Sequence, residues 1–178
     1  EPAGTLSYLK DDIDGNGTDV NTFVSNMIKE LQYAGAVGYL VEFDEKAIVK
    51  TYNKESIVNV SDSYIVLSQE YTEQSDKDKF LQVTKTEYLE LTTDENGFYI
   101  QNIWREGGSA NEGWKIVKTN EPTNRGARLT EIPFVLSTPS GKSLINSDPL
   151  LLHLANVNLD QYRMSTDHRH GLHWTALP

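Results

Sequence analysis

Apolar residues recur at helical spacing near the start of the chain. Their i, i+3, i+4, i+7 series places one apolar stripe on a helix, and it comprises Val20, Phe23, Val24, Met27, Ile28, Leu31 and Ala34. Thr18 or Asp19 can cap the N-terminus of this helix, and Gly35 can adopt the left-handed conformation that ends it. The pattern predicts a helix over residues 19–34 and, after it, a short apolar strand at residues 38–43 that lies against the helix.

From residue 47 onward the pattern changes to alternation with β-branched and aromatic residues, which is typical of strands. We expect strands at residues 47–52, 57–60, 64–71, 80–91, 98–104, 114–118 and 132–136, mostly antiparallel. The clearest hairpin turn is Asp94-Glu95-Asn96-Gly97, because Asn-Gly supplies the positive φ that a tight turn requires. Polar segments at 74–79, 107–113 and 121–128 are expected to form exposed turns or loops.

A second helical pattern ends the chain. Asp148 is a candidate N-cap and Pro149 a candidate first helical residue, so we expect a long helix over residues 149–173. One face of it carries Leu151, Leu154, Ala155, Leu159, Tyr162 and Thr166. The fold class predicted is α+β, with an N-terminal helix and short strand, a largely antiparallel sheet and a long C-terminal helix. We divide it into an α+β domain at residues 1–139 and a loop with the long helix at residues 140–178.

Composition excludes several function classes. The 178 residues include 26 acidic and 16 basic groups, a formal net charge of −10, which argues against a protein that grips nucleic acid by neutralising phosphates. The absence of cysteine excludes disulfides, thiolate zinc sites and a cysteine nucleophile. No window approaches the apolar length of a membrane span, so no membrane partner is expected. The N-terminus has neither an initiator Met nor a signal pattern, so we expect a fragment of a longer protein.

One loop resembles a calcium site. Asp12, Asp14 and Asn16 occupy the first, third and fifth positions of an EF-hand-like loop, and Gly17 provides the sharp turn at its sixth position. The twelfth position should be a bidentate Glu but is Phe23, which belongs to the apolar stripe of the first predicted helix. The sequence therefore favours a capped loop that leads into the helix over a calcium site.

The C-terminal helix carries a histidine cluster, His168, His170 and His173, and imidazole is a common ligand for zinc, copper and nickel. His168 and His170 are about 200° apart on a helix, so only His170 and His173 can face one ion. No carboxylate stands at the right turn to complete the site. A packing or hydrogen-bonding role is favoured, and no cofactor or metal is expected.

Catalytic constellations are not evident, and the protein is expected not to be an enzyme. The sequence contains no Gly-x-Ser-x-Gly elbow, and Gly141-Lys142-Ser143 lacks the earlier Gly that a phosphate-binding loop needs. The acidic pair Glu87 and Glu90 is expected on a solvated surface. Trp104 and Trp114 are expected in the core.

Three C-terminal segments resemble the portal proteins of tailed bacteriophages. They read IPFV at 132–135, DPLLLHLANVNLDQYR at 148–163 and DHRHGLHW at 167–174. Earlier segments agree with the resemblance, namely DDIDG at 11–15, GYLVE at 38–42, SIVN at 56–59 and the hairpin that carries Tyr88, Leu89 and Trp104. The similarity covers nearly the whole chain and is closest to a portal-like branch of phage domains of unknown function. In one departure from that branch, the stretch at 43–51 is shorter.

The resemblance implies a structural subunit of a prophage or phage head-tail connector. Such subunits form a homo-oligomeric ring of about a dozen copies, through which double-stranded DNA is packaged and ejected. It implies contacts with the terminase motor, with scaffold or capsid protein and with a head-tail adaptor, and a location in the virion, with assembly in the bacterial host cytoplasm. Residues 1–139 would be wing-like and residues 140–178 stem-proximal or intersubunit. The family has no catalytic residues or cofactor.

Two expectations follow for the long helix and for the alternative function. In a ring, the helix should present apolar residues that its own chain does not cover, and the candidate oligomer contacts are Leu151, Leu154, Leu159, Tyr162 and Trp174. The alternative is a calcium- or ligand-binding β-rich module, which rests on Asp12, Asp14, Asn16 and the loop tryptophans.

Overall fold

The structure is a computed structural model that describes residues 6–43, 46–61, 63–74, 80–107, 113–139, 141 and 147–175. The helical elements are η1 (Ser7–Lys10), α1 (Val20–Tyr33), η2 (Lys54–Ser56) and α2 (Leu152–Thr175). The strands are β1 (Val37–Phe43), β2 (Ala47–Asn53), β3 (Ile57–Val60), β4 (Tyr64–Gln74), β5 (Gln82–Thr93), β6 (Tyr99–Glu106), β7 (Trp114–Asn120), β8 (Thr123–Asn124), β9 (Ala127–Arg128) and β10 (Phe134–Ser137). The α+β class and the order of the main elements are confirmed.

Helix α1 has the two ends that the sequence predicts. The Asp19 carboxylate caps it by accepting the backbone N–H groups of Asn21 and Thr22 at 2.8 and 3.1 Å. At the other end Ala34 is the C-cap, and Gly35 follows with φ of 81°. Local capping chemistry therefore fixes the length of α1.

The strands form three antiparallel sheets where the sequence predicts one. The largest has the order β3-β4-β5-β6-β7, a second has the order β10-β1-β2, and β8 pairs with β9. The predicted turn between β5 and β6 is confirmed, because Gly97 has φ of 80° and donates to the Asp94 carbonyl at 2.9 Å. The segment expected as a loop at 121–128 contains the β8–β9 hairpin, whose turn residues Arg125 and Gly126 both have positive φ.

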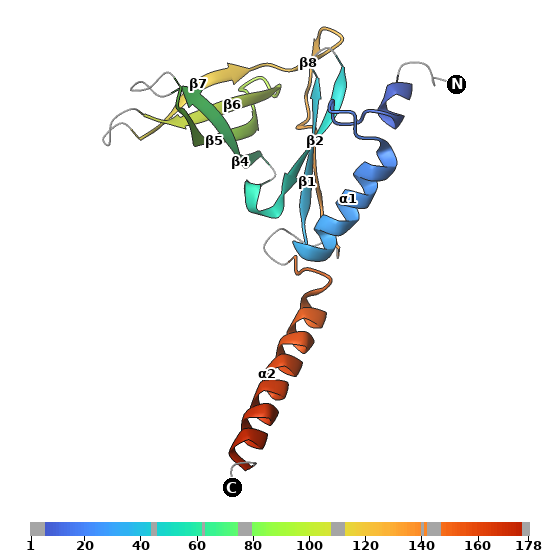
Figure 1. Ribbon diagram of the computed structural model, residues 1–178. Coiled ribbons are helices and arrows are strands. Elements are labelled where there is room, and N and C mark those ends of the chain that lie inside the picture. The colour runs from blue at the N-terminus through green and yellow to red at the C-terminus, as the bar shows by residue number, and fades with distance from the viewer. Residues whose placement is uncertain are drawn as a thin grey trace.

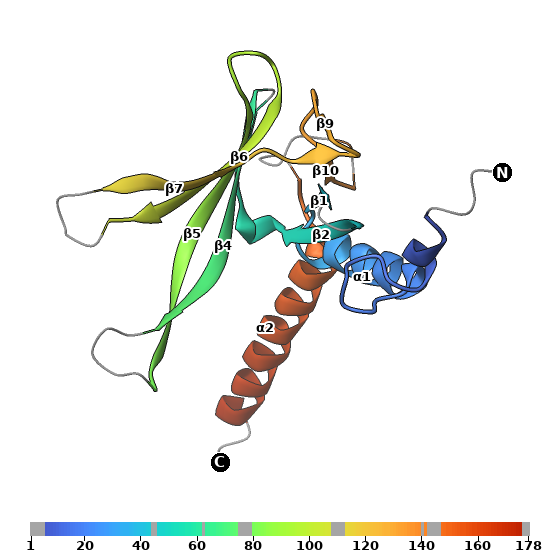
Figure 2. The same ribbon diagram turned by 90° about the horizontal axis from the view of Figure 1, so that it is seen from above.

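The core lies between the three-stranded and the five-stranded sheet (Figure 1). It is built of alternate apolar side chains that both sheets direct inward: Leu40, Tyr52, Ile57, Ile65, Leu67, Leu89, Leu91 and Tyr99. On the other side of the three-stranded sheet, Tyr39 meets Phe23 of α1 with ring centroids 5.5 Å apart. The view from above in Figure 2 shows α1 and the five-stranded sheet on opposite sides of β1 and β2.

A buried ion pair corrects one sequence prediction. Glu87 was expected on a solvated surface but is only 5% exposed, because β5 is a central strand of the five-stranded sheet. Its carboxylate accepts from Arg105 Nε at 2.7 Å and from Gln69 Nε2 at 2.6 Å. The Arg105 guanidinium also stacks over the Tyr71 ring at 3.9 Å. The burial is possible because Arg105 on the neighbouring strand compensates the charge of Glu87. The pattern of residues along one strand does not reveal such a partner.

Replacing Arg105 tests the energetic role of this network. In Arg105→Ala the buried Glu87 carboxylate keeps only the Gln69 amide, so we expect the free energy of unfolding to fall by about 1–3 kcal/mol. Urea denaturation measures the change. The matched control is Lys85→Ala, which removes an equally short ion pair to Glu73 whose side chains are half exposed, and it should cost less than about 1 kcal/mol. Equal losses in the two variants would contradict this account.

Candidate functional site

The candidate site is helix α2 together with the segment that roots it on the body. Ser147, at the root, is 1% exposed, and its carbonyl accepts from Lys54 Nζ at 2.6 Å. Further along the same segment, the Leu151 N–H donates to the Gln32 carbonyl of α1 at 3.3 Å. The chain leading into α2 is therefore held by η2 and by the last turn of α1.

Gly35 permits the closest contact at this root. A Cβ atom at Gly35 would lie 2.7 Å from the carbonyl carbon of Asp148 and from the nitrogen of Pro149. Both neighbours are backbone atoms, which cannot rotate away. Gly35 thus serves two functions, since it ends α1 in the left-handed conformation and lets the 147–149 segment pass directly over it.

This packing shifts the start of the long helix. The sequence predicts Asp148 as N-cap and Pro149 as first helical residue, but the helix begins at Leu152 and its first i+4 bond runs from Ala155 N–H to the Leu151 carbonyl. The prediction of that boundary was wrong because residues 147–151 bond to Gln32 and Lys54 before the helix can start. The helix ends at Thr175, two residues later than expected.

Beyond its root, α2 projects away from the body (Figure 1). All 24 of its residues are exposed, so the expectation that its own chain leaves it uncovered is confirmed for the described residues. Nine large apolar residues at the root and on the helix are at least 39% exposed: Leu150, Leu152, Leu154, Val157, Leu159, Tyr162, Met164, Leu172 and Trp174. Exposed apolar side chains in this number are typical of a surface that another molecule or another segment covers.

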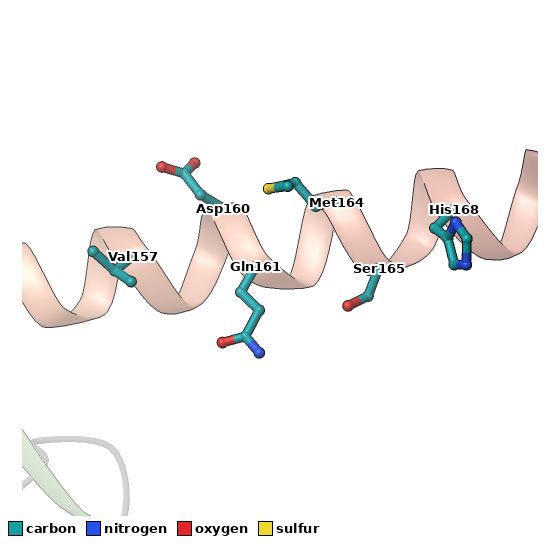
Figure 3. Close-up of a pocket in the computed structure, with 6 residues that line it drawn as sticks. All are labelled: Val157, Asp160, Gln161, Met164, Ser165 and His168. Carbon is teal, nitrogen blue, oxygen red and sulfur yellow. The ribbon is translucent and has the colours of Figure 1, made fainter.

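The predicted oligomer contacts lie on α2 and, for Leu151, at its root. Leu154, Leu159, Tyr162 and Trp174 are exposed, and Leu151 is partly covered at the root. Sequence reasoning missed a second set of side chains, on another side of the helix, which surround a shallow open hollow (Figure 3). They are Val157, Asp160, Gln161, Met164, Ser165 and His168. The spacing of Val157, Met164 and His168 could have revealed them.

The histidine cluster lies at the exposed end of α2. His170 Nε2 accepts the Trp174 indole N–H at 2.7 Å, and the two rings meet edge to face at 5.8 Å. This i, i+4 contact gives His170 the hydrogen-bonding role favoured from the sequence. Among the described residues, no group of three or more His, Asp or Glu side chains is placed to hold a metal ion, and the pair His170 and His173 gains no third ligand.

The Asp12–Asp14–Asn16 loop uses its carboxylates to hold its own backbone. Asp14 accepts from the Thr18 hydroxyl at 2.7 Å and from the backbone N–H of Asn16 at 2.9 Å, and Asp12 accepts from the Gly17 N–H at 2.9 Å. The Thr18 hydroxyl, followed by the Asn16 N–H, holds the pKa of Asp14 below its ordinary value. The loop therefore has the geometry of a hydrogen-bonded turn that leads into the capped N-terminus of α1.

A cleft of about 290 Å³ separates α1 from the three-stranded sheet. Its wall includes the Tyr39 side chain, whose hydroxyl is buried and has no hydrogen-bond partner within the described part of the chain. Burial, with a smaller effect from Glu30, raises the pKa of Tyr39 to about 12, so the hydroxyl keeps its proton at neutral pH and can donate a hydrogen bond. The cleft is large enough for water to satisfy this donor.

The tryptophans do not lie where the sequence predicts. Trp104 is half-buried on the face of the five-stranded sheet that points away from the core, and its indole N–H donates to Glu90 at 2.8 Å. Trp114 is 43% exposed on the edge strand β7 and contacts Tyr88 with ring centroids 4.6 Å apart. The core prediction was therefore wrong, because alternation assigns a face to each residue but does not say which face is covered.

Several further sequence predictions fall on residues 75–79, 108–112 and 142–146, which lie outside the described residues. None of the helices in the described ranges combines the length and the apolar content needed to cross a membrane.

Comparison of the sequence with known protein families and with curated proteins finds no match.

Substitution of Gly35 tests how α2 is rooted. Gly35→Ala adds left-handed backbone strain and places its Cβ only 2.7 Å from backbone atoms of Asp148 and Pro149, so we expect a loss of about 3 kcal/mol or more in the free energy of unfolding. Gly97→Ala is the control, because Gly97 has the same φ but nothing within 4 Å of its added Cβ. That variant should lose only about 1–2 kcal/mol. Thermal or urea denaturation measures both, and similar losses would show that the close contact is not required.

Acid titration tests the Asp14 loop. A lowered folded-state pKa means that Asp14 stabilises the fold above its ordinary value of 3.8, and this contribution is lost as the pH falls through the lower folded-state pKa. Asp14→Asn should therefore be less stable than wild type at pH 7, by about 1 kcal/mol, and the gap should narrow below pH 3.8. Urea denaturation over pH 2.5–7 measures it, and a gap independent of pH would contradict the assignment.

Proposed function

We propose that this chain is a structural subunit of a phage or prophage portal, the head-tail connector ring through which double-stranded DNA is packaged and ejected. The observation that carries the proposal is α2, a 24-residue exposed helix fixed at its root and uncovered by the described part of its chain. Portal-like sequence segments occupy the root and the helix, at 148–163 and 167–174. A ring subunit needs such a surface, because its neighbours complete the burial.

The body of the chain suits the role of a support. Its core is closed between two sheets and includes fully buried Leu40, Leu67, Leu91 and Tyr99. The body therefore has its own source of stability and does not need α2 to pack back on it. A subunit with a self-contained body and a projecting helix can add to an assembly without refolding.

The charge of the chain agrees with passage of DNA rather than with tight binding. The formal net charge is −10, and the helix region 140–178 has three basic and three acidic groups. A neutral or negative lining avoids the phosphate neutralisation that would hold a duplex in place. The proposal implies that the protein contacts the terminase motor, scaffold or capsid protein and a head-tail adaptor. It also implies that the protein is located in the virion.

Electron microscopy tests the proposal. Negative-stain images of the purified protein should show rings with an axial hole. The double variant Leu159→Asp/Tyr162→Asp should abolish the rings. Each aspartate would bury an unpaired carboxylate in the contact between neighbouring subunits, at a cost of about 1–3 kcal/mol. Leu81→Asp is the matched control, because Leu81 is 53% exposed against 52% for Leu159 but lies outside α2.

Two results would contradict the proposal. One is a uniform monomer at high concentration, since a portal subunit assembles through its neighbours. The other is a ring that survives the double aspartate variant unchanged, because α2 would then not be the assembly surface.

A further inference from the structure

The five-stranded sheet has an outer face, which points away from the core and carries a cluster of aromatic side chains. Strand pairing places Tyr88 of β5 opposite Trp104 of β6, and Trp104 opposite Ile116 of β7. Two residues earlier on β7, Trp114 pairs with Glu106 and contacts the Tyr88 ring. Trp114 and Ile116 are 43% and 47% exposed, so no described segment covers them. We call these five residues the tryptophan face.

The charges of the sheet are divided between its two faces. Side chains alternate along a strand, so the strand pairing assigns each charged residue of β3–β7 to one face. The cations of these five strands all lie on the face that carries the core, and they are Lys85, Arg105, Lys115 and Lys118. The charged residues of the outer face are all carboxylates, namely Glu70, Glu90 and Glu106. The sequence of the turn between β6 and β7, residues 107–113, also has no Lys or Arg.

Glu90 is held beside the tryptophan face by uncharged donors. Its Oε2 atom accepts the Trp104 indole N–H at 2.8 Å and the Asn102 side-chain amide at 3.1 Å. The Asn102 carbonyl oxygen in turn accepts from the Thr119 hydroxyl at 2.8 Å. These bonds orient the Trp104 ring and the carboxylate, but no donor among them is charged. The negative charge of Glu90 therefore has no counter-charge on this face.

Elsewhere the chain places a guanidinium against both an aromatic ring and a carboxylate. The Arg105 guanidinium that stacks over Tyr71 also pairs with a buried carboxylate at 2.7 Å. Arg128 lies 4.7 Å from the centre of the Phe98 ring and pairs with Asp94 at 2.9 Å. The tryptophan face has the ring and the carboxylate of this arrangement, and its own sheet supplies no guanidinium.

The chemistry of the face selects among possible occupants. A phosphate or a nucleic acid would be repelled by the three carboxylates of the outer face. An apolar surface would cover the aromatic rings but would bury Glu90 and Glu106 without a counter-charge, which is unfavourable. An arginine side chain meets both requirements, because its planar guanidinium stacks on an indole ring and pairs with a carboxylate.

We propose that the tryptophan face is a docking surface for an arginine-bearing segment of another protein, with a guanidinium stacked on Trp114 and paired with Glu106. Charge complementarity carries the inference, since the face is aromatic and acidic and its strands keep their own cations on the opposite side. The face belongs to the body and includes no residue of α2. The inference therefore does not rest on the proposed function.

Titration of the full chain with a tetra-arginine peptide tests the inference. The matched ligand is tetra-citrulline, whose side chains have nearly the same shape but carry no charge. The chain has three tryptophans, so three indole N–H signals appear in a nitrogen-15 spectrum, and Trp174→Phe identifies the one from α2. The arginine peptide should shift the signals of Trp104 and Trp114 and leave that of Trp174 in place. The citrulline peptide should bind at least about fivefold more weakly.

Substitutions on the face and matched controls locate the binding. Trp114→Ala and Glu106→Gln should each weaken binding of the arginine peptide at least about threefold. Glu95→Gln removes the same charge from an exposed carboxylate in the β5–β6 turn, and Trp174→Ala removes a 66% exposed tryptophan from α2. Both controls should bind within about twofold of wild type. Trp114 and Glu106 are exposed, so their variants should fold, and urea denaturation checks this.

Four results would overturn the inference. Equal binding of the arginine and citrulline peptides would show that the face does not recognise charge. Equal losses in the face variants and the controls would show that the net charge of −10 holds the peptide without a specific site. Unchanged Trp104 and Trp114 signals at millimolar peptide would show no docking there. Shifts caused by a neutral sugar, maltohexaose, but not by the arginine peptide would assign the face to another ligand. Rings or monomers in the microscope leave each of these results unchanged.

Discussion

The close backbone contact between Gly35 and residues 147–149 governs how the rest of the molecule is arranged. It places the end of α1 directly against the segment that leads into α2, and the Lys54 and Gln32 bonds hold that segment from two sides. From this root α2 projects away from the body (Figure 1). The described residues that hold the root, Gly35, Gln32 and Lys54, leave the helix itself exposed.

The distribution of burial separates the body from its contact surfaces. Two sheets enclose the core, and Glu87 is buried among them because Arg105 compensates its charge. Exposed apolar side chains lie all along α2, on a stripe of Val20, Val24 and Ile28 on α1, and on the five-stranded sheet, where β7 carries Trp114, Ile116 and Val117. The core of the body and the assembly surface proposed on α2 consist of different residues, so substitutions in one should leave the other largely unaffected.

The sequence predicts the features that depend on local chemistry. The Asp19 cap, the Gly35 end of α1 and the Asn-Gly turn at residues 96–97 all follow from neighbouring residues in the chain. The sequence does not predict what depends on distant segments. Helix α2 starts later than predicted because Gln32 and Lys54 hold residues 147–151. Glu87 is buried because Arg105 lies on the next strand. Trp114 is exposed because nothing described covers that face of the sheet. The uncovered helix was predicted, but the side chains around Val157 and Met164 were not, because the polar residues Gln161 and Ser165 lie between them and weaken the apolar pattern.

Hydrogen exchange as a function of protein concentration tests most directly whether other copies cover α2. At low concentration the amides of residues 152–175 should exchange far faster than those of β4, β5 and β6, because the described part of the chain leaves every residue of the helix exposed. Raising the concentration through assembly should slow exchange in α2 by about 100-fold or more and leave the body unchanged. Exchange in α2 that is slow at every concentration, or fast at every concentration, would contradict the account.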